Sequence, residues 1–77
     1  MNKTLYYIQS KKYKDIVYKC FDKEETLKYM QEEELNPKYY QIGEIKVNLD
    51  EFFKIRTIDM PKYLTKLIKD SKNDQRG

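Results

Sequence analysis

The chain has 77 residues, which suffice for one small domain, and it contains eight tyrosines, one cysteine and no histidine. A domain of this size buries only about 60% of its unfolded surface, which leaves little room for a deep catalytic cleft. Without histidine the chain lacks the usual general base near neutral pH and the commonest metal ligand. The single Cys20 excludes an internal disulfide and a thiolate zinc site, and two isolated glycines exclude a phosphate-binding loop. We therefore expect no catalytic residues, no metal and no cofactor.

Charge is segregated along the chain rather than strongly biased. Basic residues number 16 and acidic residues 13, so the net charge is +3. Residues 1–21 carry five lysines and one aspartate (+4), whereas residues 22–35 carry two lysines and six acidic residues (−4). Nucleic-acid-binding domains usually have a stronger and more clustered excess of basic residues. Fourteen lysines against two arginines are also typical of proteins encoded by AT-rich genomes.

The sequence contains no recognisable targeting or membrane-spanning segment. Residues 1–10 have no sustained apolar stretch, and no stretch approaches the roughly 20 apolar residues that a membrane-spanning helix needs. A single thiol suits a reducing compartment, because nothing in the chain requires oxidation. We therefore expect a cytoplasmic protein with no membrane partner.

Two strands are predicted at the start of the chain. Residues 4–9 and residues 16–21 are rich in β-branched and aromatic side chains, and a short polar segment connects them. Adjacent strands with a short polar connection favour an antiparallel hairpin. Cys20, in the second strand, is expected to be a small buried hydrophobic residue rather than a reactive thiol.

A helix is predicted over residues 23–35. Asp22 and Glu25 have the spacing of a capping box, in which the two residues satisfy free backbone N–H groups at the start of the helix. Pro37 ends the helix, because proline cannot continue the hydrogen-bond ladder and restricts the residue before it. The apolar stripe of this helix is thin and consists of Leu27, Met30 and Leu35.

Residues 39–47 are predicted as a third strand. The apolar residues before and after Gly43 are in opposite phase, which is typical of a β-bulge at the glycine. Residues 48–58 fit both a strand and a helical turn, and we favour a helical turn from Asp50 followed by an extended piece.

Residues 59–70 are predicted as an amphipathic helix. Asp59 is the expected N-cap, and Pro61 is tolerated in the first turn, where its missing N–H has no helical partner. Residues 71–77 are polar and are expected to form a disordered tail. The apolar face of the helix is expected to consist of Tyr63, Leu64, Leu67 and Ile68.

This order of elements predicts an α+β fold. A small antiparallel-type three-stranded sheet would pack on one helix (β-β-α-β), and a C-terminal amphipathic helix would follow. Residues 1–70 would form a single domain. The edges of such a sheet must be paired or protected, so the fold is compatible with a homodimer.

Part of this order resembles a known family. The resemblance covers residues 4–48 and rests on the segments LYYI (5–8), YKD (13–15), VYKCF (17–21), the DxxE cap with Tyr29, and YQIGE (40–44). These segments are similar to a family of very small bacteriophage and mobile-element proteins of unknown function. Its members typically run from a YVV…YSDY strand and loop through a VFS…EKAEEY strand and helix to an I-x-E-Y strand. The chain differs in lacking alanine in the helix and in adding residues 49–77. The resemblance brings no catalytic residues and implies a phage or mobile-element origin in a bacterial host's cytoplasm.

Tyrosines are the most informative residues for binding, because tyrosine offers a large contact area at little entropic cost and is enriched in binding hot spots. Alternation along the strands must place some tyrosines on the outer face. The alternative is that tyrosine only substitutes for phenylalanine and leucine in a core that has few apolar residues. The residues predicted to contact a protein partner are Tyr6, Tyr18, Tyr39, Tyr40, Phe52, Phe53, Glu32 and Glu33. In the alternative, the tyrosines of the strands stack on the bases of single-stranded nucleic acid. The residues then predicted to contact phosphates are Lys11, Lys12, Lys14 and Lys19.

The functional hypothesis is a non-enzymatic phage or mobile-element protein that acts by protein–protein binding. Its partner would be a host protein, and it would inhibit or modulate a host enzyme or an anti-phage defence system. The alternative is a nucleic-acid-binding accessory protein that uses the lysine- and tyrosine-rich hairpin, and a third hypothesis is a dimerisation module. Mimicry of nucleic acid by the acidic helix is disfavoured, because most such mimics are strongly acidic overall and this chain has a net charge of +3.

Overall fold

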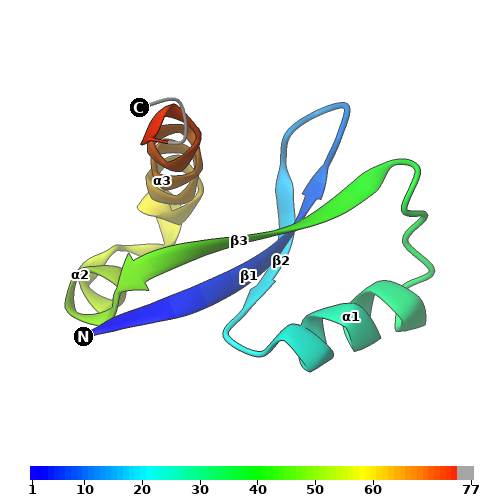
Figure 1. The fold of residues 1–77 in the computed structure, drawn as a ribbon, viewed down its shortest axis with the longest axis horizontal. Helices are drawn as coiled ribbons and strands as arrows, with labels where there is room; N and C mark the ends of the chain where they lie inside the picture. The colour runs from blue at the N-terminus through cyan, green and yellow to red at the C-terminus, as the bar shows by residue number, and fades with distance from the viewer. Residues whose placement is uncertain (75–77) are drawn as a thin grey trace.

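The computed structural model describes residues 1–74, which form a three-stranded antiparallel sheet with helices on both of its faces (Figure 1). The strands have the order β2-β1-β3, so β1 is central and the predicted β1–β2 hairpin is confirmed. The predicted α+β fold with a C-terminal helix is also confirmed. The elements in chain order are β1 (Asn2–Ser10), β2 (Ile16–Cys20), α1 (Lys23–Glu32), β3 (Tyr40–Asn48), α2 (Leu49–Lys54), the 3-10 turn η1 (Thr57–Asp59) and α3 (Met60–Asp74).

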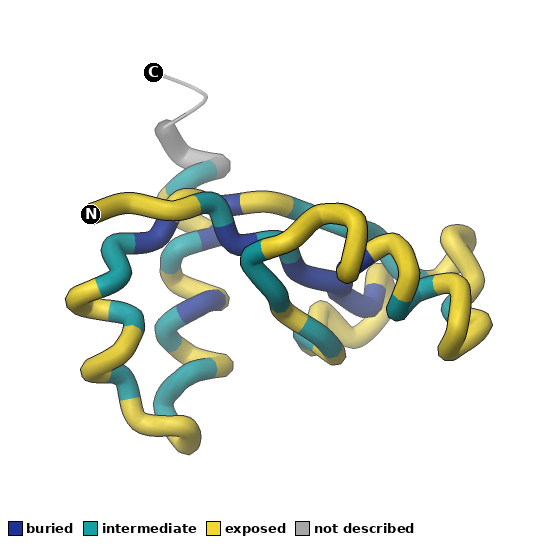
Figure 2. The backbone as a smooth tube through the Cα atoms, turned by 90° about the horizontal axis from the view of Figure 1, so that it is seen from below, coloured by how far each residue is buried: buried dark blue, intermediate teal, exposed yellow. Residues whose placement is uncertain are grey.

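Strand β1 is buried on both faces, because its alternate side chains meet different helices. Leu5 and Tyr7 belong to the core that includes α3, whereas Ile8 faces the side of α1. Ile8 and Tyr18 are directly opposite each other in the β1–β2 pair, and Tyr18 stacks on Tyr29 of α1. Figure 2 shows the buried positions concentrated in the strands and the exposed ones in the connections and on the outer helix surfaces.

The larger core lies between the sheet and α3. Leu64 and Ile68 are one helical turn apart on α3, and only 2% and 6% of their surfaces are exposed. This spacing gives α3 one apolar face towards the sheet, as the sequence predicts. The buried members of this core are Leu5, Tyr7, Ile45, Val47, Leu64 and Ile68.

Helix α1 makes a smaller contact with the opposite face. The Asp22 carboxylate accepts hydrogen bonds from the backbone N–H groups of Glu24 (2.9 Å) and Glu25 (3.4 Å), so the predicted cap is formed. Thr26 is fully buried, and its hydroxyl donates to the Asp22 carbonyl oxygen. Leu27 belongs to the predicted apolar stripe of this helix, but its side chain is 47% exposed. Helix α1 contacts the sheet instead through Thr26 and through the ring of Tyr29, which stacks on Tyr18.

Helix α1 ends at Glu32, three residues before the predicted end. Glu34 adopts a left-handed conformation (φ 53°), which ends the helix before Pro37 can do so. The Leu35 N–H donates to the Met30 carbonyl oxygen and the Glu34 N–H to that of Gln31. These two bonds define a Schellman motif, in which the left-handed position is usually occupied by glycine.

The predicted bulge at Gly43 is wrong, because β1 and β3 pair without any shift in register from Asn2–Asn48 to Ser10–Tyr40. The register shift lies instead in the β1–β2 pair, where Val17 is the extra residue. Gly43 is directly opposite Tyr7, and a Cβ atom at this position would overlap the tyrosine ring. The glycine therefore makes room for Tyr7, whose burial raises the pKa of its hydroxyl.

The C-terminal helices extend further than the sequence predicts. Helix α2 begins at Leu49, because the Asn48 side chain accepts the N–H groups of Asp50 (2.9 Å) and Glu51 (3.2 Å). The predicted extended piece is limited to the two residues between α2 and η1. Helix α3 continues to Asp74, so residues 71–74 are helical and the prediction of a disordered tail is wrong for them. Residues 75–77 of that predicted tail lie outside the described residues.

The close approach of Tyr7 to Gly43 yields a test of the core. Gly43→Ala should lower the free energy of unfolding by about 2 kcal/mol, because the added methyl group overpacks against the ring. Urea unfolding followed by circular dichroism measures this change. In a Tyr7→Leu background the same substitution should cost at least about 1 kcal/mol less, since the two sites are in contact. An equal cost in both backgrounds would show that the ring is not what requires the glycine.

Candidate protein-binding surface

The structure divides the eight residues predicted to bind a protein into two groups. Tyr6, Tyr18 and Tyr40 share the α1 side of the sheet, since they and their cross-strand partners alternate with the residues of the larger core. Glu32 ends α1 and Glu33 follows it, and Tyr39 lies in the connection from α1 to β3. The remaining two residues, Phe52 and Phe53, lie on α2.

Tyr6, Tyr18 and Tyr40 are half-buried rather than displayed. The Tyr18 ring stacks on Tyr29 with 4.0 Å between centroids and 12° between planes. A hydrogen bond with Cys20, followed by burial and nearby negative charge including Glu25, raises the pKa of the Tyr18 hydroxyl. Tyr18 therefore anchors α1 to the sheet. Tyr39, by contrast, is 57% exposed and has Lys38 near its ring face.

Cys20 is half-buried, so the expectation of a small residue inside the fold holds only in part. Its sulfur accepts a hydrogen bond from the Asp22 N–H at 3.4 Å, at the turn that leads into α1. The thiol thus contributes to the entry into the helix through this contact.

Phe52 and Phe53 have different roles although they are adjacent. Phe52 packs against the larger core and meets Phe21 edge to face, with 5.4 Å between the ring centroids. Phe53 is 73% exposed. Ile58 is 80% exposed in η1, beyond α2. Phe52 is therefore partly buried against the core, and Phe53 is the more exposed of the two.

An apolar hollow of about 730 Å³ lies where α1 ends. The Schellman motif turns the chain so that Leu35 comes back beside Met30, as is common in this motif. The hollow is lined by Leu27, Met30, Gln31, Glu34, Leu35, Asn36 and Pro37. Leu27, Met30 and Leu35 belong to the apolar stripe that the sequence predicts for this helix. The signal that could have located the hollow is Pro37, which follows Leu35 by two residues and lines the hollow.

Three acidic side chains follow one another at the end of α1. Glu32, Glu33 and Glu34 are exposed, and Glu34 itself lines the hollow. Glu32 lies 4.0 Å from Lys28, but both side chains are more than 60% exposed, so this ion pair contributes little to stability. The hollow therefore has apolar residues at its centre and one acidic side chain, that of Glu34, in its lining.

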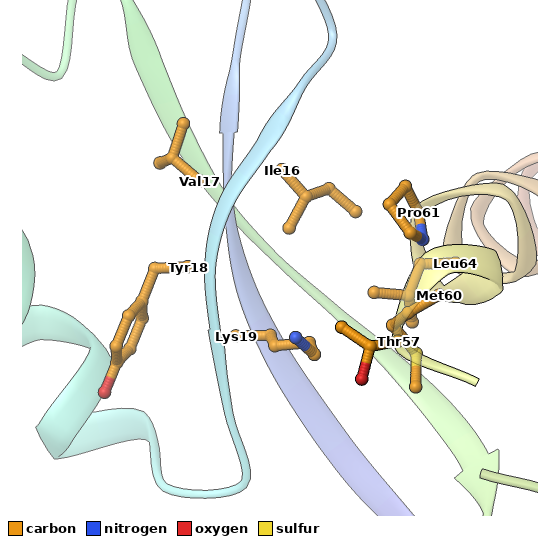
Figure 3. A pocket seen from close by; sticks show the side chains of 8 residues that line it. All are labelled: Ile16, Val17, Tyr18, Lys19, Thr57, Met60, Pro61 and Leu64. Carbon is orange, nitrogen blue, oxygen red and sulfur yellow. The ribbon is translucent and has the colours of Figure 1, made fainter. Parts of the chain in front are cut away.

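The predicted phosphate-contacting lysines lie in two places. Lys11, Lys12 and Lys14 are exposed in the connection between β1 and β2, where Lys12 is near the ring of Tyr13, which is 69% exposed. Lys19 points to the side opposite Tyr18 (Figure 3). The structure therefore does not place Lys19 on the face that carries Tyr6, Tyr18 and Tyr40.

A second groove, of about 290 Å³, separates β2 from the start of α3 (Figure 3). Ile16 and Lys19 point into it, whereas Val17 and Tyr18 point away, as expected where Val17 is the extra residue of a bulge. Met60, Pro61 and Leu64 form its other wall.

Comparisons of the chain with known proteins identify no related protein. The chain matches no protein-family model, no curated protein and no solved structure. Within residues 1–74 no three His, Cys, Asp or Glu side chains are grouped so that they could hold a metal ion. No helix in the same part of the chain is long and apolar enough to cross a membrane.

Proposed function

We propose that the chain is a non-enzymatic protein that acts by binding another protein through the apolar hollow on α1. The observation that carries this proposal is the exposure of Leu27, which is 47% exposed beside Met30, Leu35 and Pro37. An apolar hollow with a polar rim is typical of the centre of a protein–protein interface. A partner side chain in the hollow would remove these residues from water.

The charge of the segment that contains α1 indicates the chemistry of the partner. Residues 22–35 carry two lysines and six acidic residues, a net charge of −4 in a chain of net charge +3. Complementary charge raises the association rate and selects the partner. We therefore propose a partner that presents an apolar or aromatic side chain surrounded by lysine or arginine.

The biological setting of the proposal rests on the resemblance to small phage and mobile-element proteins. A protein of this origin meets its partners in the cytoplasm of a bacterial host. We propose that the partner is a host protein, either an enzyme or a component of an anti-phage defence system. A chain of 77 residues would act on it by occupying a surface that the partner needs.

A second candidate function, nucleic-acid binding, is favoured by one observation. Tyr13 is 69% exposed between three exposed lysines of the β1–β2 connection. An exposed aromatic ring beside basic residues can stack on an unpaired base while the lysines contact phosphates. The contact would then be made by this connection, since the ring of Tyr18 is already stacked on Tyr29.

Leu27→Asp tests the protein-binding proposal. The immobilised wild-type chain should retain a discrete protein from a lysate of the bacterial host, and mass spectrometry identifies it. Leu27→Asp should weaken the affinity for that purified protein at least about tenfold, because a charge replaces the apolar contact at the centre of the interface. Isothermal titration calorimetry measures the affinity.

The matched control is Ile58→Asp, which makes the same kind of change at an exposed residue of η1. This variant should bind the partner as the wild type does, and circular dichroism should show that both variants are folded. Undiminished binding by Leu27→Asp would rule out the hollow as the binding surface.

The nucleic-acid alternative has its own measurement. Fluorescence anisotropy of a labelled single strand should report binding at low salt, with the logarithm of the affinity falling against that of salt with a slope of about −2 for three lysine contacts. Replacing Lys11, Lys12 and Lys14 by alanine should abolish that binding. Absence of binding at low salt would exclude this function.

A further inference from the structure

Strand β3 is a long and regular edge of the sheet. Its nine residues, Tyr40–Asn48, pair with β1 in unbroken register, and no strand of residues 1–74 pairs with its outer side. The other edge strand, β2, has only five residues and contains the bulge at Val17. Bulges and short strands protect an edge from pairing with another chain, whereas a long regular edge invites it.

The hydrogen bonds at the two ends of the β1–β3 ladder show which backbone groups face outward. The Leu49 N–H donates to the Met1 carbonyl oxygen, and the Lys11 N–H donates to that of Tyr39, both at 2.9 Å. Hydrogen-bonded pairs alternate along an antiparallel ladder, so the odd-numbered residues of β3 bond to β1. Even-numbered residues, among them Glu44 and Lys46, present their N–H and C=O groups to the outside.

Glu44 and Lys46 are the two charged residues of β3, and both are exposed. They flank Ile45 symmetrically. In an antiparallel pair of β3 strands with the two Ile45 residues opposite each other, Glu44 lies opposite the partner's Lys46 at both ends of the pair. The neighbouring registers with the same backbone alternation place Glu44 opposite Glu44, or Lys46 opposite Lys46. The charge pattern is therefore complementary to itself in one register.

We propose that two copies of the chain pair through β3 in this register, about a two-fold axis beside Ile45. The contact is isologous, so it closes as a dimer and does not propagate. The pairs between Ile42 and Asn48 would exchange about eight backbone hydrogen bonds, because each of the four pairs exchanges two. The two three-stranded sheets become one six-stranded sheet.

A hollow of about 460 Å³ lies beside the centre of β3. It borders Thr4, Glu44, Ile45 and Lys46, and its other wall is formed by residues of α3. Helix α1 packs on β1 and β2, and none of the residues that line the hollow on α1 belongs to β3. The proposed dimer and the proposed partner surface therefore use different residues.

Charge-reversal variants test the dimer. Sedimentation in reducing buffer, which keeps Cys20 from forming a disulfide, should give the wild type twice the chain mass of 9.5 kDa. Glu44→Lys and Lys46→Glu should each sediment at the mass of one chain, because like charges then face each other. An equimolar mixture of the two variants should form a heterodimer, since two lysines of one chain then face two glutamates of the other.

The double variant E44K/K46E should restore the homodimer, because it reverses both charges of each pair. Lys62→Glu is the matched control, since it makes the same charge change at an exposed residue of α3, and it should remain dimeric. A monomeric wild type at the highest soluble concentration would overturn the proposal. So would single variants that remain dimeric, or folded single variants that form no heterodimer when mixed.

Discussion

The burial of β1 on both of its faces is the constraint on which the rest of the structure depends. Leu5 and Tyr7 are covered from the side of α3, and Ile8 is covered from the side of α1, so neither helix alone can complete the core. Because β1 is also paired on both edges, it contacts both other strands and α1 directly. A chain of 77 residues has a small margin of stability, and the burial of this one strand is a large part of its core.

The two faces are covered unequally, and this inequality accounts for the proposed binding surface. Helix α3 buries two aliphatic residues one turn apart, whereas α1 meets the sheet through Thr26 and the stacked Tyr29. A helix that is held by a small residue and one ring leaves its remaining apolar side chains accessible. Leu27 is exposed for this reason. The left-handed conformation of Glu34 brings Leu35 to the same hollow.

Local signals predicted the fold well, because strand composition, the Asp22 cap and the proline after α1 act within a few residues of each other. The errors concern contacts between distant parts of the chain. The phase change at Gly43 is visible in the sequence, but its cause is the Tyr7 ring on another strand. Periodicity likewise identified the apolar stripe of α1, although it cannot show whether another element covers Leu27. The packing of Phe52 was not predictable for the same reason, since its contact with Phe21 is long-range.

Amide hydrogen exchange, measured residue by residue by NMR, tests most directly the account of β1 as a doubly paired centre and β3 as an open edge. The account predicts slow exchange throughout residues 5–8 and alternation along β3 at low protein concentration. Ile45 and Val47 should exchange slowly there, whereas Glu44 and Lys46 should exchange rapidly and become protected as the concentration rises and chains pair. Rapid exchange in β1, or uniform exchange along β3 at every concentration, would contradict the account.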